Sequence, residues 1–266
     1  MDALHARLVR QVTDDWPRTL HEWDQYEAEA TAISAAIASD GPSVRPPGYR
    51  RLADCVPEPA AAIMFATEFG CTDVLPAAFY QLARIRADED WSLLGRAKEG
   101  CAARAPPDAK AQAKADGASG GPRLARLARW GELDCETLLR YMRGCARLDD
   151  FRERMLAADV IACAISPGCR PWWSCPEVPR PRERGEGGAA PCFDFVTALF
   201  EWAWLRRRTR DPLKALKDCL EWRTAPARVY EVCPDGLCNR CAVVLQDWVT
   251  EMRQFLWRSL PDYFEL

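Results

Sequence analysis

The sequence predicts an all-α fold, an irregular array of many helices that ends in one long amphipathic helix. Three observations support this prediction. Apolar residues recur at helical spacing from end to end, alternating runs of β-branched residues are absent, and prolines and glycines stand where helices begin and end. The 266 residues are 48% hydrophobic and 28% charged, which is enough apolar material for a packed core and excludes wholesale disorder.

The first predicted region covers residues 1–98 and consists of helices. Asp15 can cap the first long helix, which ends in a loop rich in glycine and proline. A helical hairpin follows, with Pro59 at the start of its first helix and Gly70 at its end. The second helix of this hairpin should turn one stripe inward: Leu75, Phe79, Leu82 and Ile85.

Residues 99–122 are rich in Ala, Lys, Gly and Pro, so we expect a flexible linker there. The second predicted region, residues 123–266, contains further helices and an irregular loop rich in Trp and Cys at residues 166–188. Asp134 and Asp211 are candidate N-caps. The last helix carries the clearest apolar stripe: Cys238, Cys241, Leu245, Trp248, Met252 and Phe255.

Thirteen cysteines are many for a chain of this length. The N-terminal residues do not have the pattern of a signal peptide, and the longest apolar stretch is too short and too interrupted to cross a membrane. We therefore expect an intracellular protein, cytoplasmic or nuclear, whose isolated cysteines are small buried residues in a reducing compartment. These isolated cysteines are Cys71, Cys135, Cys145, Cys163 and Cys219.

Four other cysteines form the one candidate metal site. Cys238 and Cys241 make a CxxC at a helix start, and Cys169 and Cys175 flank a Trp-Trp pair in the irregular loop. Four thiolates from two such segments can enclose a structural zinc ion. The sequence leaves three alternatives: buried thiols packed among tryptophans, which we favour, a structural zinc, and a thioredoxin-like redox motif. The redox motif is the weakest of the three because its strand–turn–helix context is missing.

No catalytic motif is present. The two histidines, His5 and His21, stand in the first helical region without a nucleophile motif, so we expect no enzyme activity; a cysteine nucleophile is the enzymatic alternative. The basic run at Arg206, Arg207, Arg208 and Arg210 could contact nucleic acid. A net charge of −3 and a pI near 5.6 argue against that partner and favour a solvated helix end.

Four strings resemble a known family. They are DDWPRTLHEWD (14–24), PEPAAAIMFATEFGCTDVLPAAFYQLARI (57–85), GCRPWW (168–173) and CNRCAVVLQDWVTEMRQFLWRSLPDYFEL (238–266). In this order they are similar to the region that follows the BTB/POZ domain in BTB/POZ-domain-containing proteins of basidiomycete fungi. The resemblance covers most of the chain except residues 99–122.

The resemblance implies a non-catalytic adaptor that binds unknown protein partners. BTB/POZ domains mediate dimerisation or recruit cullin ubiquitin ligases, but Met1 begins after the position where that domain would end, so the resemblance does not extend those roles to this chain. The matched strings contain Cys169, Cys238 and Cys241 and leave out Cys175. No catalytic residue is implied. The alternative function is a zinc-stabilised module that binds nucleic acid through its basic helix face.

Overall fold

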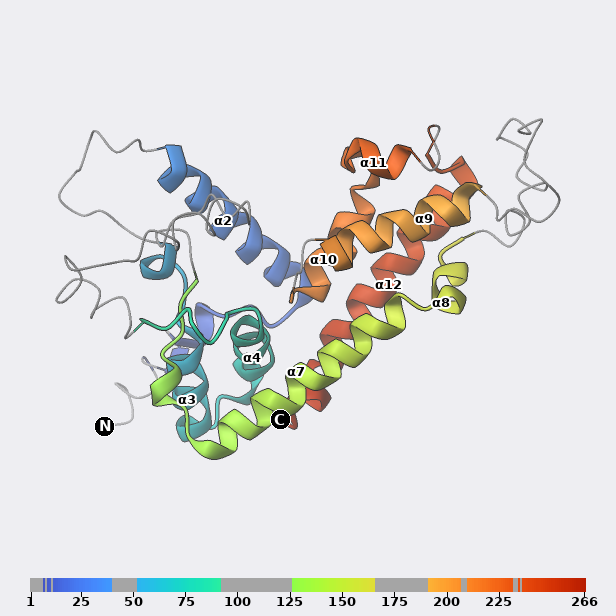
Figure 1. The fold of residues 1–266 in the computed structure, drawn as a ribbon. Coiled ribbons are helices and arrows are strands. Elements are labelled where there is room, and N and C mark those ends of the chain that lie inside the picture. Colours follow the sequence, from blue (N-terminus) through green and yellow to red (C-terminus); the bar gives the residue numbers. More distant parts are fainter. Residues whose placement is uncertain are drawn as a thin grey trace, which may run out of the picture. The chain divides into compact units, whose positions relative to one another are not determined.

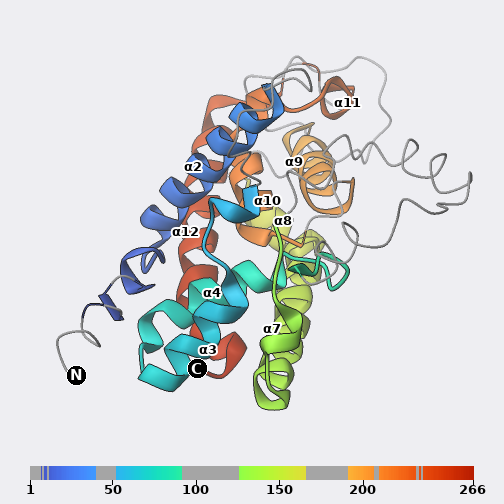
Figure 2. The same cartoon turned by 90° about the vertical axis from the view of Figure 1, so that its left-hand side faces the viewer.

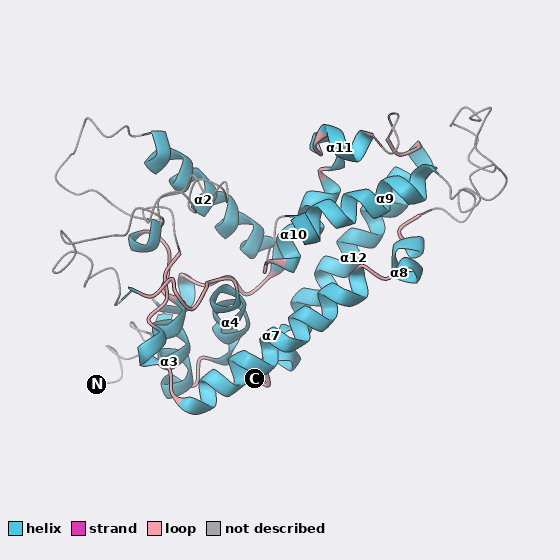
Figure 3. Cartoon of the chain, in the orientation of Figure 1, coloured by secondary structure: helices cyan, strands magenta, loops and turns pink. Residues whose placement is uncertain are grey.

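The structure is a computed structural model that describes residues 7, 9–10, 12–39, 52–91, 126–165, 191–206, 210–231, 234 and 236–266. These residues form helices and no strand, as Figures 1 and 3 show. One isolated bridge joins Asp90 and Ala128. The predicted all-α class is confirmed.

The described residues divide into two compact units. Unit 1 contains Met1–Met142 and Leu260–Leu266, and unit 2 contains Arg143–Ser259. The boundary between the units falls inside helix α7 (Cys135–Met155). The predicted linker at residues 99–122 lies outside the described residues, so the predicted division into residues 1–98 and 123–266 stays a prediction.

Unit 1 contains the predicted helical hairpin, formed by α3 (Pro59–Phe69) and α4 (Leu75–Ala83). The two helices lie side by side in Figures 1 and 2. The carboxylate of Glu58 caps α3 by accepting hydrogen bonds from the backbone of its first turn, and Gly70 ends it in the left-handed conformation at φ 68°. All four predicted stripe residues of the second helix are buried: Leu75, Phe79, Leu82 and Ile85.

Helix α2 (Leu20–Ser39) begins later than the sequence reading placed it. Its start is fixed by a capping box, in which the backbone N–H of Glu22 donates to the Thr19 hydroxyl and the backbone N–H of Thr19 donates to the Glu22 carboxylate. The cap is therefore Thr19 and not Asp15. Trp23, one turn further along, is buried with its ring 5.2 Å from that of Tyr80 on α4.

A charged cluster ties α2 to the end of the hairpin. Glu27 accepts two hydrogen bonds from the guanidinium of Arg84, at 2.8 and 2.7 Å, and forms an ion pair with Arg126 at 2.9 Å. The Arg84 guanidinium also lies 5.2 Å from the centre of the Trp23 ring. Burial raises the pKa of the Glu27 carboxyl, but the hydrogen bond and charge of Arg84, together with Arg126, outweigh burial and hold that pKa below its ordinary value.

Unit 2 is built from short helices around the first part of a long one. Asp211 caps α10 as predicted, since its carboxylate accepts the backbone N–H of Lys214 at 3.0 Å. The helices of this unit, besides the second half of α7, are α8 (Ala158–Cys163), α9 (Pro191–Glu201), the π-helical turn η6 (Trp202–Arg206), α10 (Pro212–Leu220), α11 (Ala227–Tyr230) and the portion of α12 (Asn239–Phe264) up to Ser259.

The buried stripe of α12 differs from the predicted one. Phe255 was expected to face inward and is 51% exposed, while Trp248 and Met252 are half-buried. An unbent α-helix has 3.6 residues per turn, so a stripe written at a repeat of 3.5 drifts off the buried face over several turns. The buried residues follow the longer repeat: Cys238, Cys241, Leu245, Val249, Arg253, Leu256, Leu260 and Phe264.

The search for membrane spans gave a negative result. Within the described ranges, no helix combines the length and the apolar character needed to cross a bilayer.

The charged cluster of unit 1 gives a stability prediction. Glu27→Gln should lower the free energy of unfolding at pH 7 by about 3–5 kcal/mol, because two arginines would stay buried without their carboxylate. The lowered pKa of Glu27 means that its contribution is present above the unfolded-state value of about 4.3 and is lost as the pH falls through the folded-state value. The difference from wild type in urea denaturation should therefore shrink below about pH 4.

The matched control is Glu29→Gln, an exposed glutamate on the same helix, which should change stability by about 0.5 kcal/mol or less. A Glu27→Gln protein as stable as wild type at pH 7 would contradict the assignment of Glu27 to a stabilising cluster.

Candidate metal centre

Three buried cysteines come together in unit 2. The sulfur atoms of Cys192, Cys238 and Cys241 all lie within 4.8 Å of one another. All three side chains are removed from solvent, and two of them completely. The group therefore joins residues separated by more than forty positions in the sequence.

Two helix N-termini supply these sulfurs. Cys238 directly precedes α12, and its carbonyl accepts the backbone N–H of Ala242 at 2.9 Å, as expected for a residue at the cap. Cys241 lies in the first turn of the same helix, and Cys192 is the second residue of α9. The positive end of a helix dipole favours a thiolate over a thiol, so both helix starts favour the ligating form of sulfur.

An aromatic cluster fixes α9 against the segment that leads to α12. The cluster consists of Phe195, Trp222 and Tyr230, with the Phe195 ring edge-on to the other two at 5.8 and 5.5 Å. The Tyr230 hydroxyl donates to the Trp222 carbonyl at 3.1 Å. Phe195 is one turn beyond Cys192 on α9, so the packing of its ring determines where Cys192 lies.

Gly236 completes this arrangement two residues before Cys238. Its φ is +69°, and a Cβ added to it would lie 2.9 Å from a ring carbon of Trp222. Both the backbone conformation and the close approach of the indole require glycine here. The chain can therefore pass next to the aromatic cluster and enter α12 with Cys238 and Cys241 directed toward Cys192.

The spacing of the sulfurs is suited to a metal that prefers thiolates. A tetrahedral zinc with bonds of about 2.3 Å places its sulfur ligands roughly 3.8 Å apart, so the observed group would contract by about 1 Å or less around an ion. Three thiolates supply three of the four positions of a tetrahedral site. The group could hold a metal.

Two of the four predicted ligands lie among the described residues, and two do not. Cys238 and Cys241 are both buried and belong to the cluster. Cys169 and Cys175 lie outside the described residues, as do Cys233 and the Trp172–Trp173 pair, so their place in the site stays a prediction.

Cys192 was missed by sequence reasoning because it stood inside an apolar stretch and far from the CxxC. A usable signal was present: Cys192 follows Pro191, and proline marks the first position of a helix. A cysteine in that position has the same helix-start context as the CxxC.

The isolated cysteines divide into two groups. Cys71 and Cys219 are buried as predicted, and burial, followed by the charge of Asp218, strongly raises the pKa of the Cys219 thiol. The prediction was wrong for Cys135 and Cys163, which are exposed on α7 and α8, and Cys145 is only half-buried. Helical periodicity predicts which residues share one face of a helix. In a short helix, or in one with apolar residues on two faces, it does not predict which face is buried against the rest of the protein.

Of the residues considered for other chemistry, the structure describes the side chains of His21 and Arg210, and neither belongs to the three-cysteine group. His21 is exposed on α2 in unit 1, with its ring 3.1 Å from the Gln25 amide nitrogen. His5 and two members of the basic run, Arg207 and Arg208, lie outside the described residues. Arg210 is exposed just before α10.

Fold and site together define an all-α protein with a buried three-cysteine centre at two helix starts. Comparison of the chain with protein-family models, with curated proteins and with solved structures gave no match.

The burial of the cysteines predicts their order of reaction. In native protein, iodoacetamide should modify Cys135 and Cys163 first, whereas Cys192, Cys219, Cys238 and Cys241 should react only after denaturation, because alkylation requires an accessible thiolate. Peptide mapping by mass spectrometry after timed alkylation measures this order, with guanidinium-denatured protein as the control in which all should react. Native labelling of Cys192 as fast as that of Cys163 would contradict the buried cluster.

Proposed function

We propose that this protein is a non-catalytic interaction module that binds a protein partner through the exposed apolar face of α7. This apolar face consists of Cys135, Leu139 and Met142, which recur at i, i+4 and i+7. Leu139 is 52% exposed and Met142 63% exposed. Exposed apolar side chains that line up on one helix face are typical of protein interaction sites.

The opposite side of α7 is anchored within unit 1. Thr137 is buried, and the Tyr141 ring packs edge-on to the Trp130 ring at 5.2 Å. The Asp134 carboxylate accepts the backbone N–H of Thr137 at 2.7 Å and caps the helix, and this hydrogen bond lowers the pKa of Asp134. A helix held by its cap and by one face presents the other face without reorganisation, which favours binding.

The spacing of this apolar face suits an amphipathic helix of the partner. Alternating steps of four and three residues are the pattern of a two-helix seam, in which each apolar side chain fits between those of the facing helix. Arg140 lies on a different flank of the helix and is paired with Glu136 one turn earlier, so the apolar residues are the groups left to drive docking.

The family resemblance supports the same class of function. The four matched strings occur in the order seen downstream of the BTB/POZ domain in the fungal proteins, and that resemblance implies an intracellular adaptor without catalytic residues. The assignment to a BTB-associated region and the cytoplasmic or nuclear location are part of this proposal.

Substitution of the apolar face of α7 tests the interaction. Affinity capture from an extract of the source organism should recover partner proteins with wild type, and the Leu139→Gln/Met142→Gln protein should recover at least about tenfold less of them, because the apolar contact is removed while glutamine keeps the helix intact. Quantitative mass spectrometry of the captured proteins measures the change.

The control is Asp150→Gln/Glu153→Gln, two exposed residues of the same helix at the same spacing. It should capture the wild-type set. If both double variants recover the same proteins in the same amounts as wild type, the apolar face of α7 is not a docking site.

A structural zinc ion at Cys192, Cys238 and Cys241 is the second part of the proposal. Three clustered thiolates at helix starts favour zinc over the alternative of separate packed thiols. The ion would join α9 to the start of α12 and stabilise a unit made of short helices. Cys169 and Cys175 are the predicted sources of a fourth ligand.

Metal analysis tests the zinc assignment. Purified protein should contain about one zinc per chain, and Cys192→Ser, Cys238→Ser and Cys241→Ser should each lose most of it together with thermal stability. Cys163→Ser, which removes an exposed cysteine of the same unit, should keep the metal. Separate Cys169→Ser and Cys175→Ser proteins identify the fourth ligand. Zinc content unchanged in Cys192→Ser would exclude this centre.

A further inference from the structure

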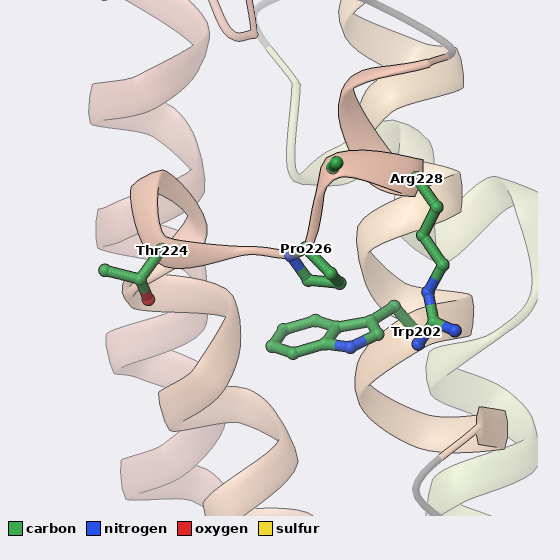
Figure 4. A pocket seen from close by; sticks show the side chains of 5 residues that line it. Trp202, Thr224, Pro226 and Arg228 are labelled. Atoms are coloured by element: carbon green, nitrogen blue, oxygen red, sulfur yellow. The ribbon is translucent and has the colours of Figure 1, made fainter.

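A second concave site in unit 2 is lined in part by the segment between Trp222 and Tyr230 of the aromatic cluster. It is a pocket of about 530 Å³ lined by Trp202, Thr224, Pro226, Ala227 and Arg228 (Figure 4). Trp202 opens the π-helical turn η6, and the other four residues precede or begin α11. The volume lies within the range of about 300–1,000 Å³ usual for ligand pockets.

The pocket has an apolar floor. The indole of Trp202 is 8% exposed, and Figure 4 shows the Pro226 ring lying over it. Single π-helical turns are rare and often occur at functional sites. The proline ring and the exposed edge of the indole together offer an apolar surface against which an aromatic ring or a proline ring can pack.

The pocket has a positive wall. The side chain of Arg228 extends alongside Trp202 in Figure 4, and its Nε is buried with no hydrogen-bond partner among the described residues. None of the five lining residues is acidic. That Nε lies below the surface, so an incoming carboxylate would instead accept charged hydrogen bonds from the terminal nitrogens of the same guanidinium, which are not among the buried unpaired atoms.

The rim determines the kind of ligand that can bind. Thr224 and Ala227 are exposed, so the pocket opens to solvent and an extended chain can cross it. One guanidinium over an apolar floor suits a planar carboxylate next to a ring. It suits a phosphate less well, because phosphate sites usually collect several donors around the anion.

We propose that the pocket of Trp202, Pro226 and Arg228 binds an acidic peptide segment in which an Asp or Glu stands beside an aromatic or proline residue. The ring packs against the Pro226 ring and the exposed edge of the Trp202 indole, and the carboxylate accepts hydrogen bonds from Arg228. This inference rests on the proposed function as a protein interaction module, and it names the chemistry of one segment that such a partner presents. It uses a surface separate from the apolar face of α7.

Selection from a peptide library tests this inference. A phage-displayed library of random nonapeptides is selected on the full-length protein, with removal of binders to the Arg228→Gln protein. The selected peptides should be enriched in Asp or Glu adjacent to Trp, Tyr, Phe or Pro. By fluorescence polarisation, a selected peptide should bind Arg228→Gln at least about tenfold more weakly than wild type, because a charged hydrogen bond is lost.

Changes to the peptide separate the two contacts without altering the fold of the protein. Replacing the acidic residue by its amide, or the ring residue by alanine, should each weaken binding about tenfold or more. Arg258→Gln is the matched control, since this arginine is exposed on α12 of the same unit and does not line the pocket. It should bind like wild type.

Three results would overturn the inference: no enrichment of the acidic–ring pattern, equal binding to wild type and Arg228→Gln, or displacement of the peptide by millimolar inorganic phosphate as readily as by excess peptide. The Leu139→Gln/Met142→Gln protein should bind the selected peptides normally. If the peptide tests at the pocket fail but partner capture still depends on α7, the proposed function remains intact. If the selected peptides bind at the pocket but partner capture does not depend on α7, only the α7 proposal is rejected.

Discussion

The packing of Phe195 against Trp222 and Tyr230 is the contact on which both sites of unit 2 depend. On one side it holds α9 where Cys192 meets the two cysteines of α12. On the other side, the segment between Trp222 and Tyr230 forms the wall of the pocket above Trp202. The short helix α11 has too few residues to be stable alone, so aromatic packing and the Tyr230 hydroxyl bond must keep this segment in place. A disturbance of the cluster would therefore reach the three-cysteine group and the pocket together.

The parts of the fold that were predictable are those set by local chemistry. The α3–α4 hairpin follows from prolines at helix starts, a left-handed glycine at a helix end and a stripe that is buried as expected. The caps at Asp134 and Asp211 follow from the hydrogen-bonding capacity of their carboxylates. The pairing of Cys238 with Cys241 was visible because both lie within one turn of the same helix. In each case the residues that matter are neighbours in the sequence.

The parts that were missed depend on contacts between distant segments or on small differences that accumulate along a helix. Cys192 joins the centre only because Phe195 packs on a segment about thirty residues away, and no local pattern encodes that contact. The predicted stripe placed Phe255 on the buried face because it followed a repeat of 3.5 residues per turn. This repeat agrees with the 3.6 residues per turn of an α-helix over two turns but diverges from it over five. The exposure of Cys135 could not be read from its helix, since α7 carries apolar residues on both sides. The acidic partner proposed for Arg228 likewise depends on the absence of any carboxylate among the five residues that line the pocket, which only coordinates reveal.

Gly236 has a consequence for the evolution of this sequence. Its left-handed backbone would strain any larger residue, and the indole, which would lie 2.9 Å from an added Cβ, would have to move. A relative that carries another residue at this position would need both a different turn and a smaller side chain in place of Trp222, so the two positions should vary together or remain fixed together. Overall sequence similarity is lost faster than such coupled pairs of residues. Remote relatives of this fold can therefore be sought by a short signature. It consists of a glycine two residues before a CxxC and a tryptophan fourteen residues before that glycine.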